Sequence, residues 1–168
     1  ANGSITSIFK FQDGAEGSII ENLRIEGNKT ASGGTILRGI EINGATDVTV
    51  QNCLFTGPNA TTGLNFGVDV VGTTSNRAKV FNSRFERLCS SSGNGSAVLV
   101  EGAQYCQIVY NDIDATEFNN FDSAPGAAIA LTQYITVGGA NNNYVGYNVI
   151  HDHPQVGISI GNPFICEP

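Results

Sequence analysis

Two acidic residues occupy the same place in two similar segments of the chain. Glu41 lies in Gly39-Ile40-Glu41-Ile42 and Asp69 lies in Gly67-Val68-Asp69-Val70. On an extended strand the apolar residues of these segments face inward and the two carboxylates face outward. Stacked strands lie about 5 Å apart, which is also the carboxylate separation of retaining glycosidases.

These carboxylates have two chemical uses and one plain alternative. Glu41 and Asp69 could act as acid and nucleophile, or hold Ca²⁺ against a uronate substrate. Glu101 lies one position further along the third such segment and could complete an acidic patch. The alternative is that all three are solvated surface residues. The sequence predicts no cofactor and no defined metal centre, and Ca²⁺ is the one ion that this acidic pair would suit.

The histidines and two arginines form a second set of candidate substrate-binding residues. The only two histidines are His151 and His153, and at i and i+2 they face one way on an extended segment. They could bind a metal or act as a general base, or simply belong to a turn before Pro154. Arg84 and Arg87 could contact a carboxylated sugar, or could be ordinary surface charges.

The scaffold for these residues repeats about every 30 residues. The first inward apolar position of each alternating strand is separated from the next by 28, 30, 31 and 29 residues, at Ile40, Val68, Val98, Ile129 and Ile158. A second strand follows in each unit and ends at an asparagine, at Asn22, Asn52, Asn82, Asn111 and Asn148. Stacked asparagines at one turn can bond one another, so we expect an Asn ladder.

A unit of three short strands cannot bury its apolar residues alone, but stacked units can. We therefore expect an all-β fold, a single-stranded right-handed parallel β-helix of about five to six rungs with three short strands per rung. One domain would span 1–168, with 1–20 as the first rung or cap and 161–168 as a tail. Irregular stretches would form loops on one flank, at 28–38, 57–66, 87–96 and 115–127. A β-sandwich would leave the repeat unexplained and needs more hairpin turns than the chain offers.

The outward side of the second strand turns apolar toward the C-terminus. The residues assigned to this patch are Phe81, Ile108, Tyr110, Val145 and Tyr147. A contiguous apolar patch marks an interface or a ligand platform. We expect self-association first, as a parallel homotrimer, and sugar stacking on the aromatics second. Cover by a long loop is the alternative.

Composition excludes several classes of partner. The chain has a formal net charge of −7, with 21 Gly, no Met and no Trp. Lys and Arg are too few to follow nucleic acid or an anionic membrane, and no apolar run approaches the ~20 residues of a membrane span. The missing Met suggests a processed chain or a piece of a larger one.

The cysteines and the glycosylation motifs bear on where the protein is found. The four cysteines, Cys53, Cys89, Cys106 and Cys166, lack zinc-site spacing and leave three disulfide pairings open. Asn-x-Ser/Thr motifs occur at Asn2, Asn28, Asn59 and Asn94, and favour an extracellular or virion location.

The run from Tyr147 to Ile160 resembles the repeats of carbohydrate-binding and sugar-hydrolase β-helices, in which Asn-x-Ile precedes a short loop and Gly-Ile-x-Ile. The resemblance covers about residues 19 to 161. It implies the pectate-lyase-like superfamily, whose members include polysaccharide lyases, glycoside hydrolases, uronate epimerases and viral tail spikes. The chain is shorter than the enzymes and carries no full catalytic motif.

Three functions follow as hypotheses. The first is a trimeric module of a viral or secreted surface protein that recognises cell-wall polysaccharide. The second is a polysaccharide lyase, glycoside hydrolase or uronate epimerase that uses Glu41 and Asp69. The third is a purely structural spacer or tip, which would have no affinity for glycans.

Overall fold

Short β-strands make up all the regular structure that the computed structural model describes. The described residues are 6–27, 37–58, 63–88, 95–114, 127–133, 139–151 and 156–161, and none of them is helical. Their strands are all paired in parallel and form three sheets. The predicted all-β parallel β-helix is therefore confirmed.

Each rung contributes one longer strand to sheet A and one shorter strand to each of sheets B and C. Sheet A contains β1 (Ser7–Phe11), β4 (Arg38–Asn43), β7 (Phe66–Val71), β10 (Ser96–Glu101), β13 (Ala127–Thr132) and β16 (Val156–Ile160). Sheet B contains β2 (Ile19–Glu21), β5 (Thr49–Gln51), β8 (Lys79–Phe81), β11 (Gln107–Val109) and β14 (Tyr144–Gly146). Sheet C contains β3 (Arg24–Glu26), β6 (Leu54–Thr56), β9 (Arg84–Phe85), β12 (Asp112–Asp114) and β15 (Val149–His151).

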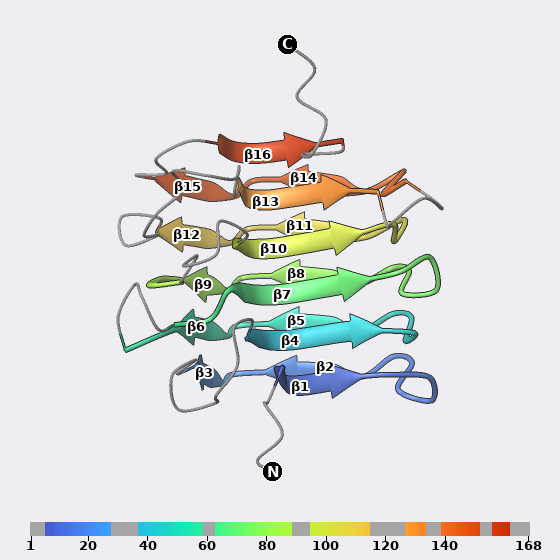
Figure 1. Ribbon diagram of the computed structural model, residues 1–168, viewed down its shortest axis with the longest axis horizontal. Coiled ribbons are helices and arrows are strands. Elements are labelled where there is room, and N and C mark those ends of the chain that lie inside the picture. The colour runs from blue at the N-terminus through green and yellow to red at the C-terminus, as the bar shows by residue number, and fades with distance from the viewer. Residues whose placement is uncertain are drawn as a thin grey trace.

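The chain winds upward from the N-terminus as a right-handed coil. It runs along sheet A at the front of Figure 1 and returns behind it through sheet B and then sheet C. From β2 to β14 this path makes four full turns, since every strand of sheet B pairs with its equivalent one turn later. The turn count is slightly lower than the five to six rungs expected.

Apolar residues from equivalent positions of each rung fill the interior of the coil. Ile40 pairs in register with Val68, which pairs with Val98, and Ile129 follows; all four are fully buried. Sheet C supplies a matching column, in which Phe55 and Phe85 stack with ring centroids 4.7 Å apart. The two inward columns that the repeat predicted therefore form one continuous core.

Glycine at the start of the sheet A strands makes room for these phenylalanines. A Cβ built at Gly67 would lie 2.5 Å from the Phe85 ring and 2.6 Å from the Ala97 carbonyl oxygen. Gly39 lies in the same way against Phe55, at 2.9 Å. Such contacts are far inside van der Waals distance, so only glycine fits where the core residue is Phe.

The predicted register of sheet B is wrong by one residue in the last two rungs. Ile108 pairs with Val80 and Val145, so it faces the core and is 1 % exposed. Val145 packs against the same core. Ile108 and Val145 therefore do not belong to an outward interface. The reason is packing, because the predicted register would have put Gly146 inward and left a core position without a side chain.

The five asparagines expected in one ladder occupy two different columns. Asn22, Asn52 and Asn82 are exposed and adopt left-handed backbone angles, with φ of 58°, 53° and 52°. Asn tolerates this conformation better than other side chains, which explains its presence there. Asn111 and Asn148 lie one position further along, in the column of Ser83 and Cys53.

A true ladder forms in that second column. The Asn111 side-chain amide donates to Asn148 Oδ1 at 3.0 Å and to the Val80 carbonyl at 3.0 Å. Asn111 Oδ1 accepts the Ser83 backbone N–H at 3.0 Å. One rung earlier, Ser83 Oγ accepts the Cys53 N–H at 3.2 Å. Side chains thus pair buried backbone groups along the bend between sheets B and C.

The other predictions about the chain fall partly outside the described residues. Cys53 and Cys106 are buried free thiols, and burial raises the pKa of Cys106 to about 11. Cys89 and Cys166 lie outside the described residues, as does most of the four stretches predicted as loops. Four described residues of those stretches, Arg38, Phe66, Ser96 and Ala127, begin strands of sheet A.

Candidate functional site

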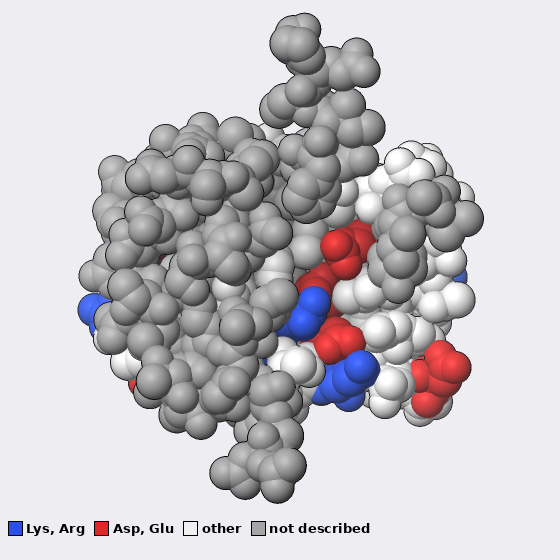
Figure 2. Space-filling view, in the orientation of Figure 1, with Lys and Arg blue, Asp and Glu red and all other residues white. Residues whose placement is uncertain are grey.

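A row of charged residues lies on the outer face of sheet A. Lys10 pairs in register with Glu41, and Glu41 pairs with Asp69, so the three form one column on consecutive strands. Arg38 begins β4, and Glu101 ends β10 on the rung above Asp69. We call Lys10, Arg38, Glu41, Asp69 and Glu101 the polar groove. In Figure 2, acidic and basic side chains alternate in a hollow over this part of the molecule.

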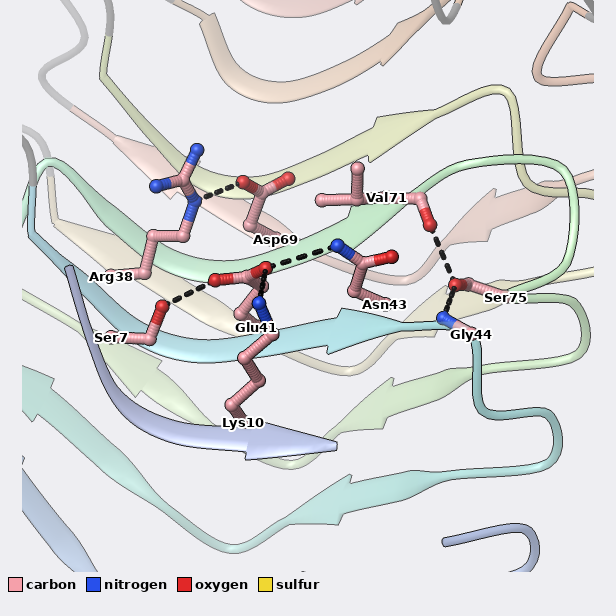
Figure 3. Close-up of polar contacts among 9 residues, drawn as sticks. All are labelled: Ser7, Lys10, Arg38, Glu41, Asn43, Gly44, Asp69, Val71 and Ser75. Carbon is pink, nitrogen blue, oxygen red and sulfur yellow. Dashed lines mark hydrogen bonds and ion pairs between the residues drawn. The ribbon is translucent and has the colours of Figure 1, made fainter. Parts of the chain in front are cut away.

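Glu41 is held by three donors from two strands (Figure 3). It accepts a hydrogen bond from Ser7 Oγ at 2.5 Å, pairs with Lys10 Nζ at 2.9 Å and accepts from Asn43 Nδ2 at 3.2 Å. Burial by itself would raise the pKa of Glu41. The three hydrogen bonds outweigh burial and lower it. Glu41 is therefore a stable anion at neutral pH.

Asp69 is fully buried, and among the described residues it pairs with one cation, Arg38. Arg38 Nε donates to Asp69 Oδ2 at 2.5 Å, and the guanidinium lies over the Phe66 ring, 5.5 Å from its centroid. Asp69 Oδ1 has no hydrogen-bond partner in the described structure. Burial raises the pKa of Asp69 to about 7, although Arg38 opposes the rise. This carboxyl group therefore exchanges its proton near neutral pH.

Glu101 joins the same electrostatic group. It is partly exposed, and burial raises its pKa while Arg38 opposes the rise. Its charge also helps to raise the pKa of Asp69. The structure thus brings together the three carboxyl groups predicted to form an acidic patch.

The alternative interpretation of Glu41 and Asp69 as solvated residues is wrong. Glu41 is 7 % exposed and Asp69 is not exposed at all. Buried carboxyl groups need cationic or hydrogen-bonding partners, and Ser7, Lys10 and Arg38 supply them. These partners come from other rungs, 31 to 34 positions away in the chain.

The remaining substrate-binding candidates lie elsewhere. Arg84 and His151 are on the outer side of sheet C, where both approach Asp112, at 3.9 Å and 3.0 Å. His151 also lies 4.0 Å from Asp114. Arg87 is exposed and follows β9 with φ of 52°. His153 lies outside the described residues, so the structure does not join this set to the polar groove.

In the polar groove, Glu41 and Asp69 each already face a cation of the chain, Lys10 and Arg38. Calcium needs six to eight oxygen ligands, so a calcium ion would have to displace these cations to reach both carboxylates. Within the described ranges, no group of three or more His, Cys, Asp or Glu residues could hold a metal.

The described residues also include no helix long and apolar enough to cross a membrane.

Four residues of the site were missed from the sequence: Ser7, Lys10, Arg38 and Asn43. Lys10 had a detectable signal, because it is the outward residue of the alternating run Phe9-Lys10-Phe11.

An open pocket of about 460 Å³ borders the groove at the end of the sheet A strands. It is lined by Gln12, Asp13, Asn43, Gly44 and Thr74.

The predicted interface patch keeps three of its five residues on the outer side of sheet B. Phe81 is partly exposed, and Tyr110 and Tyr147 are 58 % and 69 % exposed. The two tyrosine rings stack with centroids 5.0 Å apart and planes 7° from parallel. Ile108 and Val145, as described above, face the core.

Comparison with known proteins adds no relative: no family model, no curated protein and no solved structure matches the chain. The fold therefore stands on the structure itself, as a parallel β-solenoid with three parallel sheets.

Proposed function

We propose that this chain is a carbohydrate-recognition module and that the polar groove binds a cell-wall polysaccharide. The observation that carries the proposal is the row of paired carboxyl groups and cations along the outer face of sheet A. Such a row offers hydrogen-bond donors and acceptors at intervals of about 5 Å, set by the strand spacing. Sugars present hydroxyl groups of both kinds, so a mixed row suits them better than a surface of one charge.

In the polar groove the cations are more exposed than the carboxyl groups, and this difference favours binding over catalysis. Lys10 has a side chain 40 % exposed and Arg38 one 23 % exposed, so both can reach a ligand. Glu41 and Asp69 lie beneath them and fix their positions. Since a substrate would have to displace these ion pairs to touch either carboxyl group, the buried pair acts as support for the contact residues.

A second candidate function is a polysaccharide hydrolase, lyase or epimerase. One observation favours it: the environments of Glu41 and Asp69 move their pKa values in opposite directions. Adjacent carboxyl groups with separated pKa values are the usual arrangement for an acid and a base. Asp69 would be the acid, because it is the one that keeps a proton near pH 7.

The proposal also includes where the protein acts and how it assembles. A carbohydrate-binding β-helix of the pectate-lyase-like superfamily would suit a secreted or virion surface protein. A homotrimer remains part of this proposal, without an assigned contact face, because only Phe81, Tyr110 and Tyr147 of the predicted patch lie on the outer side of sheet B. No nucleic acid or membrane partner is proposed.

The test is incubation with a panel of acidic and neutral cell-wall polysaccharides, with and without Ca²⁺. Both retention of the protein and release of shorter or unsaturated products are measured. Retention without products supports the module. Product release that is lost in both Glu41→Gln and Asp69→Asn establishes the enzyme. Neither retention nor product would leave the structural spacer.

A charge-matched pair of variants assigns the site. Lys10→Gln removes an exposed cation from the groove, whereas Lys79→Gln removes one from the outer face of sheet B. We expect Lys10→Gln to weaken retention and Lys79→Gln to leave it unchanged. Equal loss in both would mean that retention depends on overall charge, and would contradict a site on sheet A.

A further inference from the structure

A cluster of exposed tyrosines lies on a different face of the coil from the polar groove. Tyr110, Tyr144 and Tyr147 surround the outer side of strands β11 and β14. They are 58 %, 51 % and 69 % exposed. Sheet B lies behind sheet A in Figure 1, so this cluster and the groove point away from each other.

Two of these tyrosines adopt a backbone conformation that their residue type disfavours. Tyr110 and Tyr147 have φ of 57° and 56°, at the position that Asn22, Asn52 and Asn82 occupy in the earlier rungs. A bulky side chain rarely adopts positive φ, whereas Asn does so readily. The C-terminal rungs thus carry a strained residue where the N-terminal rungs carry a suitable one, and local strain of this kind gathers at functional sites.

The side chains of Tyr110, Tyr144 and Tyr147 form one aromatic surface. Tyr144 lies over Gly146, since a Cβ built on that glycine would be 2.6 Å from the Tyr144 hydroxyl oxygen. The stacked rings of Tyr110 and Tyr147 stand beside it. Any larger residue at 146 would push the Tyr144 ring away from the sheet.

The size of this surface argues against a second copy of the chain as its occupant. An aromatic side chain has roughly 200 Å² of surface, so the three tyrosines expose about 350 Å². A stable protein interface needs about 800 Å² from each partner. The outward residues next to the tyrosines on β8 and β11 are the polar Lys79 and Gln107 and the partly exposed Phe81 and Val109.

We propose that Tyr110, Tyr144 and Tyr147 form a second carbohydrate subsite, which stacks a neutral pyranose ring. The apolar C–H face of such a ring packs on tyrosine, and its hydroxyl groups pair with the phenol oxygens and Gln107. This inference rests on the proposed carbohydrate-binding function, but it uses a different face and different residues from the polar groove.

The chain provides its own matched control. Tyr105 also has positive φ, at 59°, and is 56 % exposed. It lies at the opposite end of β11, in the column of Asp47, Arg77 and Asn142, and has no stacked partner among the described aromatics. Tyr110→Asn, Tyr147→Asn and Tyr105→Asn therefore make the same chemical change at the same backbone geometry.

The experiment uses cellohexaose and maltohexaose as neutral probes and an oligogalacturonate as the acidic probe. The chain contains five Tyr and no Trp, so its intrinsic fluorescence reports these side chains directly. We expect a neutral probe to change the fluorescence, and Tyr110→Asn and Tyr147→Asn each to weaken binding about 10-fold or more. Tyr105→Asn should bind normally. All three variants should melt at or above the temperature of the unaltered chain, because Asn suits the backbone better.

The outcomes separate this inference from the proposed function. If the unaltered chain binds the acidic probe and neither neutral one, the groove stands and the tyrosine subsite is rejected. Neutral binding that survives both Tyr110→Asn and Tyr147→Asn also rejects it. If no probe or panel polysaccharide binds, both proposals fail. If the two variants change the sedimentation coefficient from oligomer to monomer, the surface is an oligomer interface and the inference is overturned.

Discussion

The N-terminal and C-terminal halves of the coil solve the same structural problems with different residues. From β1 to β9, the core stacks Phe55 on Phe85 and the bend carries Asn at positive φ. From β10 to β16, the core column continues as Ile113 and Ile150, and tyrosines take the strained positions. The column of Glu41 and Asp69 continues as Leu99, Ala130 and Ser159. One backbone repeat can thus keep its shape while each half carries a different surface.

The largest effect should come from breaking the buried ion pair of the N-terminal half. Arg38→Ala leaves Asp69 buried without its cation, and we expect a loss of about 3 kcal/mol in the free energy of unfolding. The loss is at the low end for buried pairs because Asp69 can take up a proton. Urea unfolding at pH 7.5 measures it.

Two variants control for this prediction. Arg77→Ala removes an exposed pair with Asp47 and should have a much smaller effect. Adding Asp69→Asn to Arg38→Ala should recover part of the loss, since no buried charge then remains. A loss of equal size in Arg38→Ala and Arg77→Ala would show that burial of Asp69 is unimportant.

In the C-terminal half, the Asn ladder should matter most. Asn111→Ala leaves the Ser83 N–H and the Val80 carbonyl without their side-chain partner, so we expect a loss of about 2 kcal/mol. Asn111→Ser keeps one acceptor, as Ser83 does one rung earlier, and should lose less. Thermal unfolding of the two variants side by side measures the difference. If Ser were as damaging as Ala, the hydrogen bonds would not be the cause.

The core glycines should show the contrast between the halves directly. Gly67→Ala forces a methyl group against Phe85 and should cost about 1–2 kcal/mol. Gly157→Ala places the same methyl group 3.8 Å from Ile150, an ordinary contact, and should be close to neutral. Denaturant midpoints of both variants provide the comparison. Equal costs would mean that the glycines are kept for backbone reasons and not for the phenylalanines.

The smallest predicted effect is a pH dependence near neutral pH that comes mainly from Asp69. Its pKa is near 3.9 in the unfolded chain and about 7 in the folded one, so between these values the folded state binds more protons. Stability should therefore fall as pH rises, by about 1 kcal/mol from pH 6 to 7.5. Glu41 has the opposite sign, since its lowered pKa makes stability fall when pH drops below about 4. Asp69→Asn should remove the slope above pH 6, and a slope that survives this substitution must come from another group.

The repeat made the fold predictable. Spacings of 28 to 31 residues and the inward columns of sheets A and C were visible as alternating apolar residues, and the structure confirms them. The register of sheet B was harder to predict, because the recurrent Asn does not mark a single structural position. Asn serves two physical roles one residue apart, positive φ at Asn82 and the ladder at Asn111. The empty core position implied for Gly146 was the signal that would have corrected the register.

The candidate site was predictable only in part. Alternation correctly put Glu41 and Asp69 in one column, because register follows from the repeat. Their burial was not predictable, because it depends on Ser7 and Arg38 reaching across from other strands. Side-chain reach of this kind has no period in the sequence, so a pattern of alternation cannot reveal it.

A coil of equivalent rungs also affects how such a protein can evolve. Each rung contacts mainly its neighbours, so duplication or loss of a unit of about 30 residues preserves every other contact. Because the ion pairs of the groove lie on β1, β4 and β7 and the tyrosines lie beside β11 and β14, a unit inserted after β9 would change their separation by about 5 Å and leave the ion pairs and the stacked tyrosines intact. The distance between two recognition surfaces could then be inherited as a number of rungs.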